Sequence, residues 1–269
     1  MIYFSQIIIQ RISIIMTDRQ IFNMIIAGVK IRAAAQLPST LEYCKEYVTG
    51  EDFKPDIFAE VTPELIGFIR KDGEADERDK GLAHVEVPQF QAELLALHKA
   101  ISDKMPAYGR ALFHSSAVAV DGQAVLFTAP SGTGKSTHAR LWKKLLGERL
   151  VSINDDKPFI GFDVKDGKEQ PLSVYGSPWM GKHRIGANTS APIKAVCLIN
   201  RSDDNRVEKA DPLSVFASLF NQTYRPRETE MLKQTMLILK KLAEEVPVYN
   251  IYCNMEPDAA KVAYETIFG

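Results

Sequence analysis

The chain has 269 residues, of which 45% are hydrophobic and 25% are charged, and its formal net charge at pH 7 is −1. These are ordinary values for a globular protein with one large domain or two small ones. The near-zero charge argues against the basic footprint of a nucleic-acid-binding protein. The three cysteines, Cys44, Cys197 and Cys253, are odd in number and far apart, which argues against a disulfide framework and favours the reducing cytoplasm.

The first residues of the chain, 1–16, are unusually apolar and carry Arg11 in the middle. The segment is too short for a transmembrane helix, and it lacks the basic start and the small-residue cleavage site of a signal peptide. We therefore expect no membrane association. An edge strand and an upstream start codon, with Met16 or Met24 as the true start, are the two explanations, and the sequence does not choose between them.

The N-terminal third predicts a small β-rich part. Residues 21–35 predict a strand, with Gly28 as a turn or bulge. Residues 38–47 predict a short helix that starts at a proline, and residues 56–61 predict another extended stretch.

A dense run of charges, KDGEADERDK, occupies residues 71–80. The ordinary explanation of such a run is a solvated loop or hairpin tip, which we expect here. It separates a small N-terminal α/β part, residues 1–88, from a core of residues 89–269.

This core contains both predicted helices and predicted strands. A helix over 90–101 is followed by two apolar runs, 115–120 and 124–128, and Asp121-Gly122 between them predicts a hairpin. The later elements that we expect are strands over 149–153, short strands within 158–175, a buried strand over 193–200 with a partner that begins at Val207, a helix over 231–242, a strand over 246–253 and a last helix from Pro257.

The strongest motif is APSGTGKST at residues 129–137, between an apolar strand and a helix-like stretch. A strand, a glycine-containing loop and Lys-Ser opening a helix form the phosphate-cradling P-loop. Ala129 replaces the usual first glycine, which is tolerated where the backbone φ is not positive. The alternative is a chance Gly/Ser turn, which the flanking strand and helix argue against. We expect phosphate contacts from Ser131, Gly132, Thr133, Gly134, Lys135, Ser136 and Thr137, with Lys135 on the outer phosphates and Ser136 on Mg²⁺.

A pair of carboxylates, Asp155 and Asp156, ends the first strand after the P-loop helix. Ligands of α/β folds bind at such strand ends. Adjacent carboxylates repel unless a cation lies between them, so one suits a metal and the other suits a base for an attacking hydroxyl. An exposed Asp-Asp turn is the alternative.

His114 comes just before the hairpin. A lone histidine is more often structural than a phosphate or acid–base group.

Two loops carry further cations. In residues 176–186, Lys182, His183 and Arg184 could stabilise a transferring phosphoryl group, or form a surface turn with Trp179 in the core. For residues 224–227, YRPR, a turn between helices is favoured over an anion site.

The order histidine, hairpin, S-G-x-G-K-S and a strand that ends in Asp-Asp resembles the C-terminal domain of HPr kinase/phosphorylase. It is more distantly similar to the nucleotide core of ATP-dependent phosphoenolpyruvate carboxykinase. A weaker similarity continues over residues 176–188 and 193–200. The N-terminal part shows no such resemblance, and the R-G-containing signature of the family has only a loose match near Lys182 and Arg184.

The resemblance implies an α/β (α+β) fold, in which a P-loop kinase core is built on a mixed sheet with flanking helices. In it, Lys135 would bind the β- and γ-phosphates, and Ser136 and Asp156 would hold Mg²⁺. Asp155 would be the general base toward a substrate hydroxyl, and His114 would lie near the transferred phosphate. Lys182 or Arg184 would stand near the family's arginine, and the loose match there argues against phosphorylase activity and HPr recognition.

The function that we predict is therefore a cytoplasmic, Mg²⁺/ATP-dependent kinase. Its substrate would be serine in a peptide or small protein, by analogy with stand-alone relatives of HPr kinase that modify peptides. The family tends to form homo-oligomers. A non-catalytic nucleotide-binding scaffold and a kinase of free serine or another metabolite are the alternatives. GTP or pyrophosphate as donor stays open.

Overall fold

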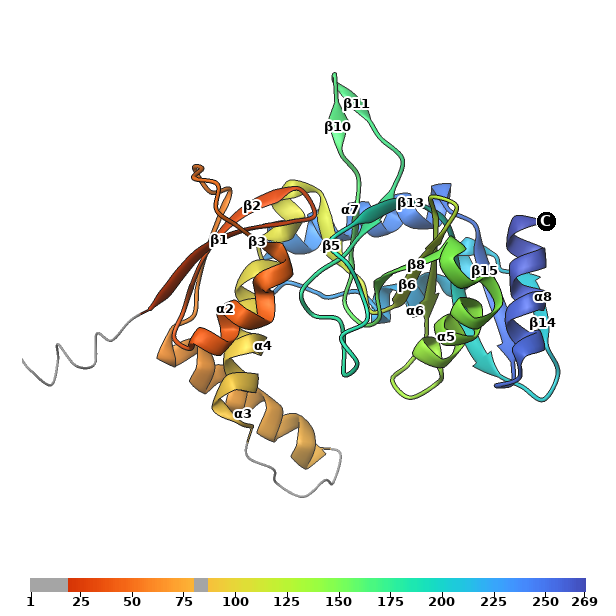
Figure 1. Cartoon of the computed structure of the whole chain (residues 1–269), viewed down its shortest axis with the longest axis horizontal. Coiled ribbons are helices and arrows are strands. Elements are labelled where there is room, and N and C mark those ends of the chain that lie inside the picture. The colour runs from red at the N-terminus through yellow and green to blue at the C-terminus, as the bar shows by residue number, and fades with distance from the viewer. Residues whose placement is uncertain (1–18, 80–86) are drawn as a thin grey trace, which may run out of the picture. The chain divides into compact units, whose positions relative to one another are not determined.

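The computed structural model describes residues 19–79 and 87–269 (Figure 1). The chain divides into two units, one of residues 19–25 and 30–101 and one of residues 26–29 and 102–269. The boundary expected between residues 88 and 89 falls just before helix α4 (Gln89–Ser102), which lies almost wholly in the first unit. The apolar segment 1–16 is outside the described residues.

The first unit is built on a four-stranded sheet of order β3-β1-β2-β4. Its strands β1 (Gln20–Ile26) and β2 (Val29–Ala35) join at Ala27-Gly28, both with positive φ, as the turn expected at Gly28 requires. The sheet is completed by β3 (Val48–Thr49) and β4 (Ile57–Glu60), and the helical elements are α2 (Pro38–Cys44), η1 (Lys45–Tyr47), α3 (Pro63–Asp79) and α4.

A buried carboxylate ties two of these helices together. Glu93 of α4 accepts hydrogen bonds at Oε1 from the backbone N–H groups of Gln36 and Leu37, at 3.0 and 2.9 Å, and from Thr40 Oγ1 at 2.8 Å. Because α2 has no side-chain cap of its own, Glu93 satisfies the donors at its start.

The charge run at 71–80 is not a loop: residues 71–79 continue helix α3, and Lys80 lies outside the described residues. Glu, Ala, Lys and Arg are good helix formers, so a run of such charges can prolong a helix that has already started at Pro63. The prediction of a solvated loop was wrong because it weighed charge alone.

The second unit has a nine-stranded sheet, and its order β5-β9-β12-β13-β7-β6-β8 is extended by β15 on β13 and β14 on β15. The sheet is mixed, as the family resemblance implied, because β13 is parallel to β7 and β15 while β6 is antiparallel to β7 and β8. The strands are β5 (Arg110–Leu112), β6 (Ser116–Val120), β7 (Gln123–Thr128), β8 (Leu150–Asn154), β9 (Phe159–Gly161), β12 (Ser173–Tyr175), β13 (Ser190–Arg201), β14 (Arg206–Lys209) and β15 (Val248–Cys253).

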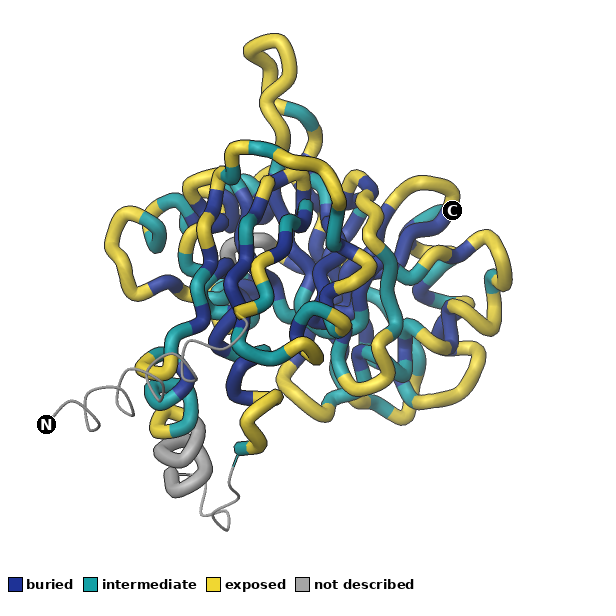
Figure 2. The backbone as a smooth tube through the Cα atoms, turned by 60° about the vertical axis from the view of Figure 1, so that its left-hand side comes forward, coloured by how far each residue is buried: buried dark blue, intermediate teal, exposed yellow. Residues whose placement is uncertain are grey.

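Helices cover both faces of this sheet. Apolar residues of α5 (Lys135–Leu146) and α8 (Pro257–Phe268) pack with one face, and those of α6 (Pro212–Asn221) and α7 (Thr229–Glu245) pack with the other. The buried segments in Figure 2 follow the strands between these helix layers. Two short helices, η2 (Met105–Tyr108) and η3 (Gly147–Arg149), lie in connections.

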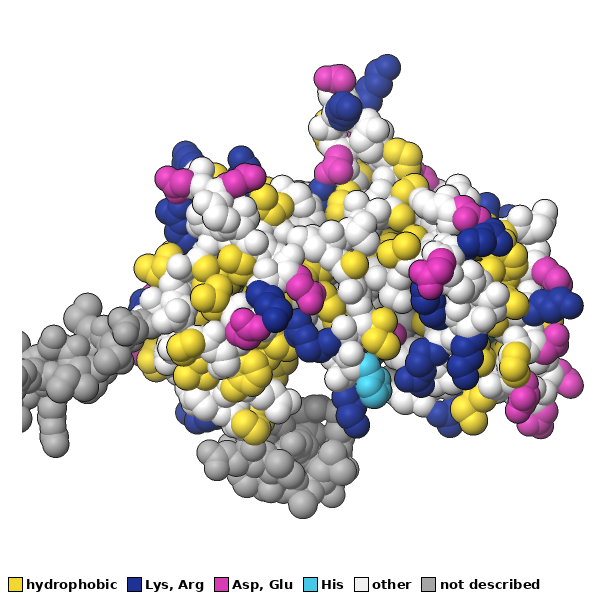
Figure 3. Space-filling view, viewed as in Figure 1, with side chains coloured by type: hydrophobic (Ala, Val, Ile, Leu, Met, Phe, Trp, Pro, Cys, Tyr) yellow, Lys and Arg dark blue, Asp and Glu magenta, His cyan; other side chains and the backbone are white. Residues whose placement is uncertain are grey.

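A separate two-stranded hairpin, β10 (Val164–Lys165) and β11 (Lys168–Glu169), projects from the second unit (Figure 1). Side chains of both charges lie at its tip and over the rest of the face shown in Figure 3. No helix in residues 19–79 or 87–269 has the length and apolarity to cross a membrane.

One strand pairing differs from the expectation. β14 was expected to pair with the strand before it, β13, but it pairs antiparallel with β15, which lies between the two. The reason is the apolar β15: as a central strand, it buries Val248 and Ile251, whereas the polar β14 suits the edge.

The topology places the C-terminal ends of four strands at one edge. β7, β13 and β15 are mutually parallel, and β8 has the same direction as β7 because both are antiparallel to β6. The P-loop, Asp155-Asp156 and Asn254 follow three of these ends, and Arg201 is the last residue of the fourth strand, β13. This is the edge at which α/β sheets bind their ligands.

Candidate active site

The motif at 129–137 has the geometry of a P-loop. β7 ends at Thr128, the loop turns through Gly132 and Gly134 at φ 77° and 132°, and α5 begins at Lys135. Only glycine adopts these φ values without strain. Ala129 is buried and is not a positive-φ residue, so the missing first glycine costs the loop nothing in backbone strain.

The start of α5 has no side-chain cap and no acidic residue in its first turn. The first N–H groups of any helix lack intrahelical partners, and here no capping side chain occupies them, so the positive end of the helix faces the loop. This is the arrangement that binds phosphate groups at helix N-termini.

The Lys135 ammonium lies in the loop. It donates a hydrogen bond to the carbonyl oxygen of Ala129 at 2.9 Å and lies 3.5 Å from that of Pro130. Burial lowers the pKa of Lys135, whereas the negative charges of Asp156 and Asp155 act in the opposite direction. Since an ammonium has three donors, the contact with Ala129 leaves capacity for a phosphate oxygen.

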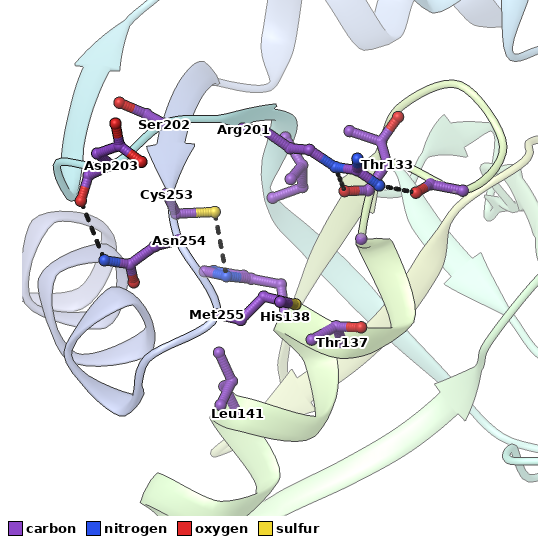
Figure 4. A pocket seen from close by; sticks show the side chains of 13 residues that line it. Thr133, Thr137, His138, Leu141, Arg201, Ser202, Asp203, Cys253, Asn254 and Met255 are labelled. Carbon is purple, nitrogen blue, oxygen red and sulfur yellow. Dashed lines mark hydrogen bonds between the residues drawn. The ribbon is translucent and has the colours of Figure 1, made fainter.

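Arg201, at the end of β13, holds the outer side of the P-loop (Figure 4). Its guanidinium donates to the carbonyl oxygens of Gly132 and Thr133, the latter at 3.1 Å. In a trans peptide the N–H group points opposite to the C=O group, so these contacts fix the orientation of the following two N–H groups. Arg201 was not among the predicted site residues, because its contact with the P-loop depends on the β13–β7 pairing.

Asn154 positions the two carboxylates. Its Oδ1 accepts hydrogen bonds from the backbone N–H groups of Asp156 and Lys157 at 2.9 and 2.8 Å. Its Nδ2 donates to the carbonyl oxygen and the hydroxyl of Ser177, at 3.0 and 3.1 Å. The side chain is buried, so the turn that carries Asp155 and Asp156 is fixed from the core. Asn154 was not among the predicted site residues.

Asp155 faces the start of α5. Its Oδ1 accepts a hydrogen bond from Ser116 Oγ at 2.7 Å. Asp155 and Ser136 also line one small cavity of about 80 Å³, together with Arg140 and Ile185. A hydroxyl and a carboxylate oxygen are ligands that Mg²⁺ accepts alongside phosphate oxygens and water, so Ser136 and Asp155 have suitable donor atoms, but the cations Arg140 and Lys143 also line the cavity. No cluster of three or more His, Cys, Asp or Glu side chains that could hold a metal occurs in residues 19–79 and 87–269.

Asp156 faces His114. The His114 Nε2 atom lies 3.3 Å from Asp156 Oδ1, and Lys157 Nζ lies 3.5 Å from Oδ2. Burial disfavours the charge of Asp156, but the hydrogen bond with His114 and the charge of Lys157 outweigh it and lower the pKa of the carboxyl. Asp156 is therefore ionised at neutral pH.

His114 is held from three directions. Its backbone N–H donates to the carbonyl oxygen of Gln222 at 2.7 Å, and its Nδ1 lies 2.9 Å from Gln222 Oε1. Its carbonyl oxygen accepts from Thr128 Oγ1, the last residue before the P-loop, at 2.9 Å. His114, which the sequence alone left undecided, therefore joins the P-loop and the carboxylates.

The loop at 176–186 contributes its backbone. Gly181, at φ 73°, lies so close to the carboxylates that a Cβ atom there would be 3.1 Å from Asp156 Cβ. Trp179 is buried, whereas Lys182, His183 and Arg184 are exposed. The buried tryptophan and the exposed cations agree with the interpretation of this loop as a surface turn, and its contribution next to the carboxylates is the backbone at Gly181.

The turn at 224–227 joins α6 and α7, as expected of a turn between helices. Tyr224 Oη donates to Asp103 at 2.7 Å, and the exposed Arg225 guanidinium lies over the Phe220 ring at 5.0 Å. The three cysteines are buried and free, as expected.

No protein-family model and no curated protein sequence matches this chain. Among solved structures, the chain is similar to the HPr(Ser) kinase/phosphatase from Coxiella burnetii, with 12% sequence identity and a TM-score of 0.24. The match covers 50% of this chain and 92% of that chain. A similarity at this level says nothing about the activity of this chain. The chemistry of the candidate site is therefore argued from its residues alone.

Proposed function

We propose that the chain is a Mg²⁺/ATP-dependent kinase that transfers the γ-phosphoryl group to a hydroxyl, with serine of a peptide or small protein as the expected acceptor. The observation that supports this most directly is that the P-loop and the Asp155-Asp156 turn follow the ends of β7 and β8, two strands with the same direction, so that the charges of both aspartates act to raise the pKa of Lys135. A phosphate held at the loop would thus have carboxylates and a lysine beside it. The free thiols support a reducing compartment such as the cytoplasm.

In the proposed reaction, the acceptor oxygen forms a bond to the γ-phosphorus, and the bond from that phosphorus to the β-phosphate oxygen breaks. The backbone N–H groups of the P-loop and the start of α5 bind the phosphate oxygens. Lys135 offsets negative charge on the transferring group. Mg²⁺, when bound, would neutralise phosphate charge.

The two carboxylates have different proposed roles, one in metal binding and one in accepting the proton of the acceptor hydroxyl. The cavity shared by Ser136 and Asp155 supports Asp155 as the carboxylate on the metal side. The contact between His114 and Asp156 supports Asp156 as the group that accepts the proton of the acceptor hydroxyl, with His114 holding its carboxylate in place. This assignment exchanges the roles that the resemblance implied for Asp155 and Asp156. We assign no step to Lys182 or Arg184, which are exposed.

A non-catalytic nucleotide-binding scaffold is the principal alternative. Such a protein needs Lys135 and Ser136 but has no use for a histidine fixed against a carboxylate. The paired contacts of Gln222 with His114 at 2.7 and 2.9 Å favour a catalytic role over this alternative.

The decisive experiment measures phosphate transfer from γ-labelled ATP to a library of serine-containing peptides, with free serine as a parallel acceptor. We expect transfer to peptide by the wild type and none by Lys135→Ala or Asp156→Asn. Asp166→Asn is the matched control, because this aspartate lies at the exposed β10–β11 turn at φ 53°, which asparagine also adopts. Full transfer by Asp156→Asn would contradict the catalytic proposal, and transfer to free serine alone would favour a metabolite kinase.

A further inference from the structure

A second cavity opens on the other side of the P-loop from the carboxylates. In the strand order, β8 and β6 lie on one side of β7, and β13 and β15 lie on the other. The cavity has a volume of about 580 Å³, which is within the range of small-molecule sites. It lies between the P-loop, α5 and the ends of β13 and β15, and Figure 4 shows its lining side chains.

The inner wall of this cavity is apolar and uncharged. Leu141, Ile199 and Cys253 contribute buried side chains to it. His138 also lines the cavity, and burial lowers its pKa to about 4, so that it is neutral at physiological pH. Such a wall suits the faces of an aromatic base better than a charged group.

The rim carries an exposed methionine. The side chain of Met255 is 77% exposed although it borders the cavity. Methionine adapts its shape to flat aromatic ligands and makes favourable sulfur–aromatic contacts. An apolar side chain that lines the cavity together with Leu141 would gain buried area when a base enters.

Hydrogen bonds of Asn254 hold the rim of the cavity. Asn254 Nδ2 donates to the carbonyl oxygen of Asp203 at 3.1 Å, and Asn205 Oδ1 accepts from the Asn254 backbone N–H at 3.1 Å. Asn254 Oδ1 also accepts from the N–H of Glu256 at 3.0 Å. The β13–β14 and β15–α8 connections are thereby joined, so less ordering is needed on binding.

We propose that this cavity binds the nucleoside of the donor, so that its polyphosphate runs across the P-loop toward Asp155 and Asp156. The inference rests on the proposed function and goes beyond it. It places the base at the β13 and β15 ends, makes Met255 and Leu141 its neighbours, and favours a nucleoside triphosphate over pyrophosphate as donor.

The test compares calorimetric binding of ATP, GTP and inorganic tripolyphosphate, each with Mg²⁺. Tripolyphosphate has the phosphates without the nucleoside. We expect the wild type to bind at least one nucleotide about tenfold or more tightly than tripolyphosphate. Met255→Gln should weaken nucleotide binding by about five- to tenfold and leave tripolyphosphate binding unchanged, because it removes apolar contact without adding charge. Leu237→Gln is the matched control, since this residue is 59% exposed on α7.

The outcomes separate the two proposals. Equal binding of nucleotide and tripolyphosphate by the wild type, with both lost in Lys135→Ala, would overturn the nucleoside site and leave the P-loop function standing. An unchanged nucleotide affinity in Met255→Gln would also overturn it. Nucleotide binding that survives Lys135→Ala would contradict the proposed function. No binding of any probe would overturn both.

Discussion

The Nε atom of Arg201 donates a hydrogen bond to the carbonyl oxygen of Thr133 at 3.1 Å, and the same guanidinium also reaches the carbonyl oxygen of Gly132. A side chain at the end of β13 thus fixes peptide groups in the loop after β7. The phosphate cradle therefore depends on a neighbouring strand as well as on its own glycines.

Replacing Arg201 should loosen this cradle. We expect Arg201→Ala to weaken binding of Mg²⁺-tripolyphosphate by about tenfold, the scale set by losing one to two charge-assisted hydrogen bonds. Calorimetry with tripolyphosphate isolates the loop from the cavity that Arg201 also borders. Arg206→Ala, in the next strand, is the control. Arg201→Lys should not restore binding, because lysine lacks the planar fork. Wild-type affinity in Arg201→Ala would show that the loop holds its shape alone.

The two carboxylates should differ in their metal dependence. We expect Asp155→Asn to raise the Mg²⁺ concentration needed for half-maximal nucleotide binding by about tenfold or more, because the variant removes a charged ligand beside Ser136. Asp156→Asn should abolish transfer with a smaller change in this concentration. Titrating Mg²⁺ at fixed ATP measures both. The reverse pattern would support the roles implied by the family resemblance.

Gly181 should be required for the position of Asp156. Gly181→Ala places a methyl group against that side chain at a positive φ, so we expect a loss of about 1 kcal/mol in stability together with a large loss of transfer. Gly167→Ala is matched, because Gly167 has φ 71° and no atom near its missing Cβ. Chemical denaturation and transfer assays should show similar destabilisation in both variants and lost transfer only in Gly181→Ala.

Stability should fall in mild acid because of His138. Its ring nitrogen Nε2 accepts a hydrogen bond from Trp142 Nε1 at 3.2 Å, and burial lowers its pKa from 6.5 to about 4. The unfolded chain therefore binds a proton at His138 more readily than the folded chain does. The contribution of the neutral His138 ring to the free energy of unfolding is complete above pH 6.5 and is lost as the pH falls toward 4. The loss is on the order of 3 kcal/mol.

Urea denaturation between pH 7 and pH 4 measures this contribution. The free energy of unfolding should decline less steeply in His138→Gln than in the wild type. His183→Gln, at an exposed histidine, should keep the wild-type slope. Parallel slopes for wild type and His138→Gln would show that His138 is protonated without unfolding.

Local elements of the fold were predictable where the conformation of a residue depends on its own type and on its neighbours in the chain. Asp121-Gly122 occupies a positive-φ turn between β6 and β7, as an Asp-Gly pair between apolar runs predicts. The charge run at 71–79 was mispredicted because its helix continues from Pro63 rather than from a signal within the run. The pairing of β14 with β15 was missed because the two strands are separated by α6 and α7 in the chain.

The sequence by itself determined the P-loop and the Asp155-Asp156 strand end, because glycine conformations, helix starts and strand ends depend on adjacent residues. Only the tertiary structure decided that Gln222 clamps His114, that Arg201 holds the P-loop and that Met255 and Leu141 border one cavity. The residues in each of these contacts are far apart along the chain. Their meeting follows from the strand order and the burial of both sheet faces, to which the whole chain contributes.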